Sequence, residues 1–129
     1  MGGRIKVIGV FEPEEDWHLE DEDGQRLEGA LSPVAHLVAS LVGCSGLTMR
    51  GVMDKMKIEH QGIVIEGIAA ISDERPTFVR SIWLEVSAPG ACINEAQFAS
   101  ILEMTEKYCL IAQTFRHGPE LILSAKTIP

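Results

Sequence analysis

The strongest constraint on the fold is one long segment, from Ser32 to about Met56, whose apolar residues recur at helical spacing. Ser32 and Pro33 form a typical helix start, an N-cap followed by a proline whose missing N–H costs nothing there. Small residues are frequent along the segment and would let another helix approach closely. This helix is therefore predicted to be central and buried on most sides, with Cys44 at its middle.

The other segments are predicted to be mainly strands in hairpins, followed by a second helix. Asn94 and Gln97 resemble a capping box at the start of that helix, which would end near Cys109. Turn signals stand at Asp23-Gly24 and at Asp73 to Pro76. The predicted strands run over Arg4 to Phe11, Trp17 to Glu20, Gln25 to Leu27, Ile58 to Ser72, Thr77 to Ser87 and Glu120 to Thr127.

This order of elements lacks a regular alternation of strand, helix and strand. We therefore expect an α+β fold in which an antiparallel sheet packs against two helices. In the strand over residues 77–87, Phe78, Arg80, Ile82, Leu84 and Val86 are expected on one face. The 129 residues suit a single domain, with an N-terminal hairpin region over 1–31 and a core of helix, strands, helix and strand over 32–129.

The acidic charge is concentrated in the N-terminal region. Between Glu12 and Glu28 there are nine acids and one base, Arg26, which gives this segment the whole formal net charge of −8. It is predicted to be a solvated loop or hairpin, because Asp21 to Gly24 lacks the ligand spacing of a calcium loop. An acidic chain without a Lys/Arg cluster also argues against nucleic acid or an anionic membrane as the main partner.

Neither a membrane span nor a secretion signal is expected. No apolar run reaches the ~18 residues that a spanning helix needs. The first six residues, Met-Gly-Gly-Arg-Ile-Lys, lead into a strand-like pattern without a signal-peptide core. The expected location is the cytoplasm.

Cysteine carries the chemistry that the sequence offers. The three cysteines, Cys44, Cys92 and Cys109, are too few and too scattered for a structural zinc cage or a disulfide framework. The sequence also lacks the common hydrolase, metalloprotease and nucleotide-binding motifs. His36 precedes Cys44 by about 12 Å along a helix, too far for a Cys–His pair. From residues alone, the thiols are either buried apolar groups or a functional pair with one spare.

Two cysteine motifs resemble the OsmC/Ohr family. The run from Ser32-Pro33 through Leu37-Val38-Ala39-Ser40-Leu41-Val42-Gly43-Cys44-Ser45 is similar to the family's proline-headed central helix. Glu106-Lys107-Tyr108-Cys109 resembles its second cysteine motif, and Gln113-Thr114-Phe115 and the strand from Glu120 fit the same template. The resemblance extends from Ser32 to the C-terminus.

The resemblance implies an intertwined homodimer that works as a thiol peroxidase, without a metal or an organic cofactor. Cys44 would be the peroxidatic thiol, which attacks a hydroperoxide and becomes a sulfenic acid. Cys109 would be the resolving thiol, which forms a disulfide with it that a dithiol reductant then opens. Cys92 has no place in this pattern.

The chain departs from the family pattern at two positions and leaves the activating arginine to be assigned. Organic hydroperoxide resistance members carry a glutamate after the helix-heading proline, which holds an activating arginine over the thiolate, and this chain has Val34 there. Arg26 is the better candidate for that arginine, with Arg4 as the alternative. Leu110 replaces the proline that usually follows the second cysteine. These departures leave two rival hypotheses open, a non-enzymatic protein that binds a small ligand and a redox sensor with negligible turnover.

Overall fold

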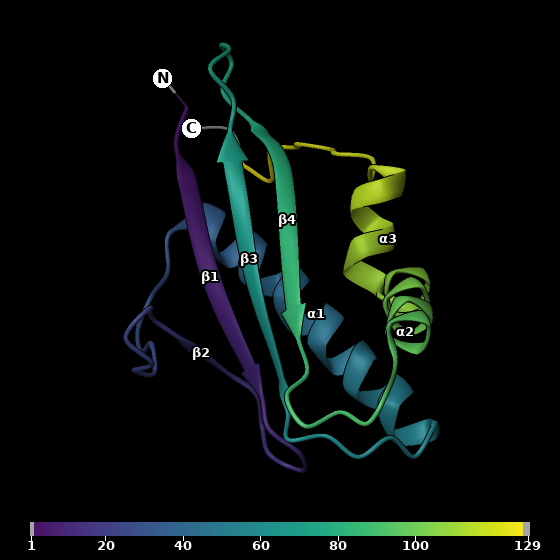
Figure 1. The fold of residues 1–129 in the computed structure, drawn as a ribbon. Helices are drawn as coiled ribbons and strands as arrows, with labels where there is room; N and C mark the ends of the chain where they lie inside the picture. The colour runs from purple at the N-terminus through teal and green to yellow at the C-terminus, as the bar shows by residue number, and fades with distance from the viewer. Residues whose placement is uncertain (1, 128–129) are drawn as a thin grey trace.

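The computed structural model describes residues 2–127, which form an antiparallel sheet with helices on one side (Figure 1). The elements follow in the order β1 (Arg4–Phe11), β2 (His18–Glu20), α1 (Pro33–Lys55), β3 (Ile63–Ile71), β4 (Val79–Ser87), α2 (Glu95–Tyr108) and α3 (Leu110–His117). The strands lie in the order β2-β1-β3-β4, and all neighbours are antiparallel. The predicted α+β class is confirmed.

Helix α1 lies diagonally across one face of the sheet, and α2 and α3 lie beside it, beyond β4 (Figure 1). Alternate residues of β3 point toward α1, so that Ile63, Ile65 and Ala69 are buried. Gly67 continues this row, and a Cβ there would come within 2.7 Å of the side chains of both Val38 and Val42. The core therefore depends on a small residue in β3 that lets α1 pack closely on the sheet.

The starts of both predicted helices are confirmed. The Ser32 side chain accepts a hydrogen bond from the backbone N–H of Ala35, and Pro33 begins α1. At α2 the capping box is complete, because Asn94 and Gln97 each accept a hydrogen bond from the other's backbone N–H. Local sequence chemistry is therefore sufficient to fix both helix starts.

The N-terminal hairpin forms in a shorter version than the sequence predicts. Strand β2 covers three residues, and an isolated bridge pairs Glu20 with Arg26 across the turn. Gly24 has φ of +83°, a left-handed conformation that a turn glycine adopts readily. The acidic side chains of the surrounding segment are mostly exposed, as predicted.

The predicted face of β4 is wrong at its beginning. A β-bulge between Ala70 and Ile71 pairs Ile71 with Val79 and Ala70 with Ser81. Val79 consequently packs against the core, while Phe78 and Arg80 are exposed. A bulge shifts the alternation by one residue, which a strictly alternating pattern cannot predict.

The C-terminal region differs most from prediction. The expected strand from Glu120 to Thr127 is absent from the described chain, and a helix that was not predicted, α3, precedes this segment. Leu121, Ile122 and Leu123 are 89%, 73% and 94% exposed. The segment has a strand-like sequence, but within residues 2–127 it finds no strand with which to pair.

Among the described residues, no helix combines the length and apolar character that crossing a membrane would require.

Candidate active site

Cys44 lies in the middle of α1 and is half-buried, between two glycines, Gly43 and Gly46, that pack against aromatic rings. A Cβ on Gly43 would lie 2.5 Å from the Trp17 indole, and one on Gly46 would lie 2.1 Å from the Phe11 ring. The two rings stack on each other with centroids 5.3 Å apart. The small residues near Cys44 therefore accept aromatic side chains, where the sequence suggested the close approach of a second helix.

Cys109 lies at the junction of two helices and is fully buried. Its backbone N–H donates to the carbonyl of Thr105 and so ends α2. Its Sγ accepts a hydrogen bond from the backbone N–H of Ala112, at 3.5 Å, and so caps the start of α3. One residue thus ends one helix and begins the next.

The fold brings the two cysteines of the sequence hypothesis together, although 65 positions separate them in the chain. Both are free thiols, and they lie near enough for Cys44 to act on the pKa of Cys109. Burial raises the pKa of the Cys109 thiol, and Cys44 raises it further. The Ser45 hydroxyl and the Ala112 N–H act in the opposite direction and lower that pKa.

A cavity of about 560 Å³ opens between β4 and the helices, and neither thiol lines it, but Ser45 and Ala112, which both hydrogen-bond to Cys109, do. Its wall is mainly apolar and includes Ser45, the immediate neighbour of Cys44. A cavity of this volume is within the range of small-molecule sites. It is lined by Leu41, Ser45, Met49, Ile65, Ile82, Leu84, Val86, Leu102, Thr105, Glu106, Ala112, Phe115 and Arg116.

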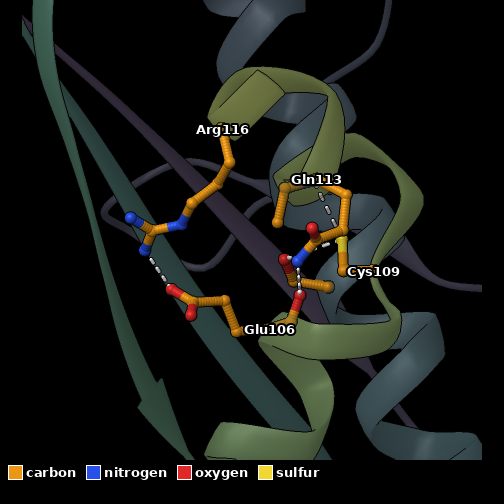
Figure 2. Close-up of polar contacts among 6 residues, drawn as sticks. Glu106, Cys109, Gln113 and Arg116 are labelled. Carbon is orange, nitrogen blue, oxygen red and sulfur yellow. Dashed lines mark hydrogen bonds and ion pairs between the residues drawn. The ribbon is translucent and has the colours of Figure 1, made fainter. Parts of the chain in front are cut away.

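Two polar contacts tie α3 to α2 at the edge of this cavity (Figure 2). Arg116 forms an ion pair with Glu106, and the Gln113 side chain donates a hydrogen bond to the Glu106 carbonyl at 3.0 Å. The ion pair is largely exposed, so its contribution to stability is small. Its main effect is to place one positive and one negative group on a mainly apolar wall.

Arg26, the predicted activating residue, is exposed in the N-terminal hairpin. None of the ion pairs within residues 2–127 involves it. The hydrogen bond to Glu12 and the Glu12 charge raise the pKa of Glu15, and the Arg26 charge only partly opposes that rise. Val34 is half-buried and packs against the core. Cys92 is exposed in the loop before α2, and His36 is exposed on α1.

Within residues 2–127, no group of three or more His, Cys, Asp or Glu side chains is arranged to hold a metal ion.

Residues 23–124 match the family model for the OsmC-like protein. The chain belongs to the OsmC-like family. No curated protein matches the chain closely enough to add to this assignment.

Solved structures of family members have the same fold. The chain resembles an OsmC-like hydroperoxide resistance protein from Jannaschia sp. CCS1, with 16% identity over 98% of this chain and 96% of that one, at a TM-score of 0.76. An OsmC-like protein from Mycoplasma pneumoniae is 12% identical over 92% and 89%, at 0.63. The organic hydroperoxide resistance protein OhrB of Bacillus subtilis is 12% identical over 88% and 92%, at 0.54.

Sequence reasoning missed several residues of this site. Ser45 follows Cys44 directly, and its small side chain suggested only close packing. Glu106 belongs to the recognised motif but had no expected partner, because α3, which carries Arg116, was not predicted. Cys109 is the N-cap of α3, and this role was missed for the same reason.

Proposed function

We propose that this protein reduces organic hydroperoxides through Cys44 and Cys109. The observation that carries the proposal is the proximity of two free thiols, one half-buried and one fully buried, beside an apolar cavity. The more accessible thiol, Cys44, is the one that an incoming substrate can reach. The buried thiol, Cys109, is suited to react with its neighbour after that first step.

The proposed cycle needs only thiol chemistry. The Cys44 thiolate attacks the O–O bond, which breaks to give a sulfenic acid on Cys44 and an alkoxide that is protonated to the alcohol. The Cys109 sulfur then attacks the Cys44 sulfur, so that an S–S bond forms, the S–O bond breaks and water leaves. A dithiol reductant exchanges with the disulfide and restores both thiols. The electrons come from the thiols, so the proposed cycle uses no metal or organic cofactor.

The cavity supports an organic rather than an inorganic hydroperoxide as substrate. Its apolar wall favours a hydrocarbon tail, and Ser45 links that wall to the thiols. Arg26 stays our proposed activating residue, although it is exposed here. An Arg26→Ala variant with unchanged peroxide consumption would remove it from the mechanism.

We further propose that the working unit is a homodimer. Leu121, Ile122 and Leu123 are exposed on a strand-like segment. Strand β4 pairs only with β3 among the described residues, so that its nine-residue outer edge keeps unpaired backbone groups. If this segment paired with the sheet of a second copy, its apolar side chains would be buried and the backbone groups at the edge of the sheet would be hydrogen-bonded. Such an exchange would make the dimer intertwined.

Steady-state peroxide consumption tests the proposed activity. Cumene or tert-butyl hydroperoxide is mixed with dihydrolipoamide and wild-type protein, and the loss of peroxide is followed against the Cys44→Ser variant. We expect consumption that requires Cys44 and falls sharply in Cys109→Ser. A wild-type rate equal to that of Cys44→Ser would overturn the proposal. Cys92→Ser is the matched control, since Cys92 is exposed in the loop before α2 and does not line the cavity, and it should retain the wild-type rate.

The same cavity favours a second candidate function, the binding of a small apolar ligand without turnover. Thermal unfolding with and without medium-chain fatty acids tests it. A rise in Tm with ligand, together with peroxide loss no faster than in Cys44→Ser, would replace the enzymatic proposal. A disulfide that forms with hydroperoxide but is not reopened by dihydrolipoamide would instead indicate a redox sensor.

A further inference from the structure

Ser45 lines the cavity and lies between it and the two cysteines, neither of which lines the cavity itself. It is adjacent to Cys44 in the chain, and its Oγ lies 3.5 Å from the Sγ of Cys109. Ser45 is 5% exposed and Cys109 is fully buried, so water has little access to this contact. A hydrogen bond in such surroundings is stronger than one at the surface.

Protonation of Cys109 decides the direction of this hydrogen bond. A neutral thiol can donate its proton or accept one, but a thiolate can only accept. Once Cys109 ionises, the Ser45 hydroxyl therefore has to donate to it. The Ala112 N–H, at 3.5 Å, is the second donor and belongs to the first turn of α3, where the helix dipole favours negative charge.

Few other charges act on Cys109. From α1 the neighbouring titratable group is Cys44, which disfavours a second negative charge. On the same cavity wall α2 provides Glu106 and α3 provides Arg116, and these two pair with each other. The strands contribute apolar side chains to this wall. Ser45 and Ala112 are therefore the local groups that offset the cost of burying a thiolate.

We propose that Ser45 is a positioning residue that stabilises the thiolate of Cys109 and orients its sulfur toward Cys44. The consequence for the reaction rests on the proposed function. The thiolate of Cys109 is the form that attacks the Cys44 sulfenic acid, forming the S–S bond while hydroxide leaves and is protonated to water. In this step Ser45 donates a hydrogen bond to the Cys109 thiolate and is itself neither oxidised nor reduced.

The first test measures Cys109 without any turnover. In a Cys44→Ser, Cys92→Ser background, Cys109 is the sole thiol, and its pKa is obtained from the ¹³Cβ chemical shift of labelled cysteine across pH. Adding Ser45→Ala should raise this pKa by about one unit, which lowers the thiolate fraction about tenfold at neutral pH. Ser45→Thr retains a hydroxyl and should restore the lower pKa.

Thr48→Val is the matched control, since its hydroxyl lies on the same helix but donates to the Cys44 carbonyl. It should leave the pKa of Cys109 unchanged. An equal pKa in the Ser45→Ala and parent proteins would overturn the inference, and so would a Thr48→Val shift as large as that of Ser45→Ala.

The second test follows disulfide formation after one equivalent of cumene hydroperoxide in protein that retains Cys44 and Cys109. Ser45→Ala should slow this step several-fold near neutral pH and raise the pH at which its rate is half-maximal. Equal rates at every pH would overturn the role of Ser45 in this step. If no variant consumes peroxide while Ser45→Ala still shifts the Cys109 pKa, the proposed function fails and the assignment of Ser45 to the thiolate stands.

Discussion

At the scale of single residues, the two cysteines differ mainly in what surrounds them. Cys44 lies in mid-helix and is half-buried, whereas Cys109 is fully buried, caps α3 and makes two hydrogen bonds at its sulfur. The sequence predicted Cys44 and Cys109 as a pair from their motifs. It could not predict these surroundings, because they depend on how α3 begins and on which helix face meets the other.

The raised pKa of Cys109 predicts a pH dependence of stability. Burial favours the neutral thiol in the folded state, so that the folded pKa lies above the unfolded one. This contribution is fully present below the unfolded pKa and is lost as pH rises through the folded pKa. The free energy of unfolding of the reduced protein should therefore fall more steeply than that of Cys109→Ser as pH rises above the ordinary cysteine pKa of ~8.5.

Urea denaturation of the two proteins across this pH range measures the difference. The two proteins differ only at residue 109, so the comparison isolates the Cys109 thiol. Parallel pH profiles would contradict the assigned burial of the thiol.

The glycines of α1 provide a second prediction at this scale. Gly46→Ala should destabilise the protein by about 1–3 kcal/mol, because its Cβ would overlap the Phe11 ring. Gly51→Ala lies in the same helix with open space at the Cβ, and should stabilise it by about 0.5–1 kcal/mol through helix propensity. Urea denaturation of both variants gives the comparison, and changes of the same sign would refute the packing at Gly46.

At the scale of elements, local chemistry predicted the helix starts and most turns. It did not predict how the start of β4 pairs or that residues 120–127 lack a strand partner within the described chain. Caps such as Ser32 and the pair Asn94 and Gln97 involve neighbours in sequence, so the residues suffice to place them. The bulge in β4 depends on its pairing with β3, and whether residues 120–127 form a strand likewise depends on a partner strand elsewhere. Helix α3 is eight residues long, and its start coincides with the predicted end of α2, so the periodic pattern did not separate them.

The geometry of α3 explains how Leu110 fits where the family usually has proline. Leu110 is the first residue of α3, where proline is favoured, and Cys109 before it has the extended ψ of 113° that a following proline requires. Leu110→Pro should therefore leave the free energy of unfolding within about 1 kcal/mol of wild type. Thr114→Pro, in the interior of α3, should cost about 3 kcal/mol. Thermal unfolding tests both, and equal losses would show that α3 does not begin at Leu110.

At the scale of the whole molecule, residues 2–127 expose a strand-like segment and leave the outer edge of β4 unpaired. Deleting residues 120–129 removes the segment that we propose joins a second copy. Light scattering coupled to size exclusion should give twice the chain mass for the full protein and a smaller mass or aggregation for the truncated one. A full-length protein that stays monomeric at high micromolar concentration would contradict the proposed dimer.

The overall class, the central helix and the cysteine pair could all be predicted from sequence because each has a local pattern or a recognisable motif. The apolar cavity could not, because its wall combines residues from three helices and two strands. The acidic segment was predicted to be solvated, and its exposed side chains confirm this. The strand partner that we propose for residues 120–127 belongs to a second copy of the chain, and the sequence pattern of one chain does not specify it.

The central claim is that Cys44 and Cys109 react as one redox pair. Reduced protein is treated with one equivalent of cumene hydroperoxide, alkylated to trap remaining thiols and digested for mass spectrometry. We predict one disulfide-linked peptide joining Cys44 to Cys109, with Cys92 alkylated, and a stable sulfenic acid on Cys44 in the Cys109→Ser variant. Recovery of all three cysteines as alkylated thiols, with the peroxide unconsumed, would contradict the account.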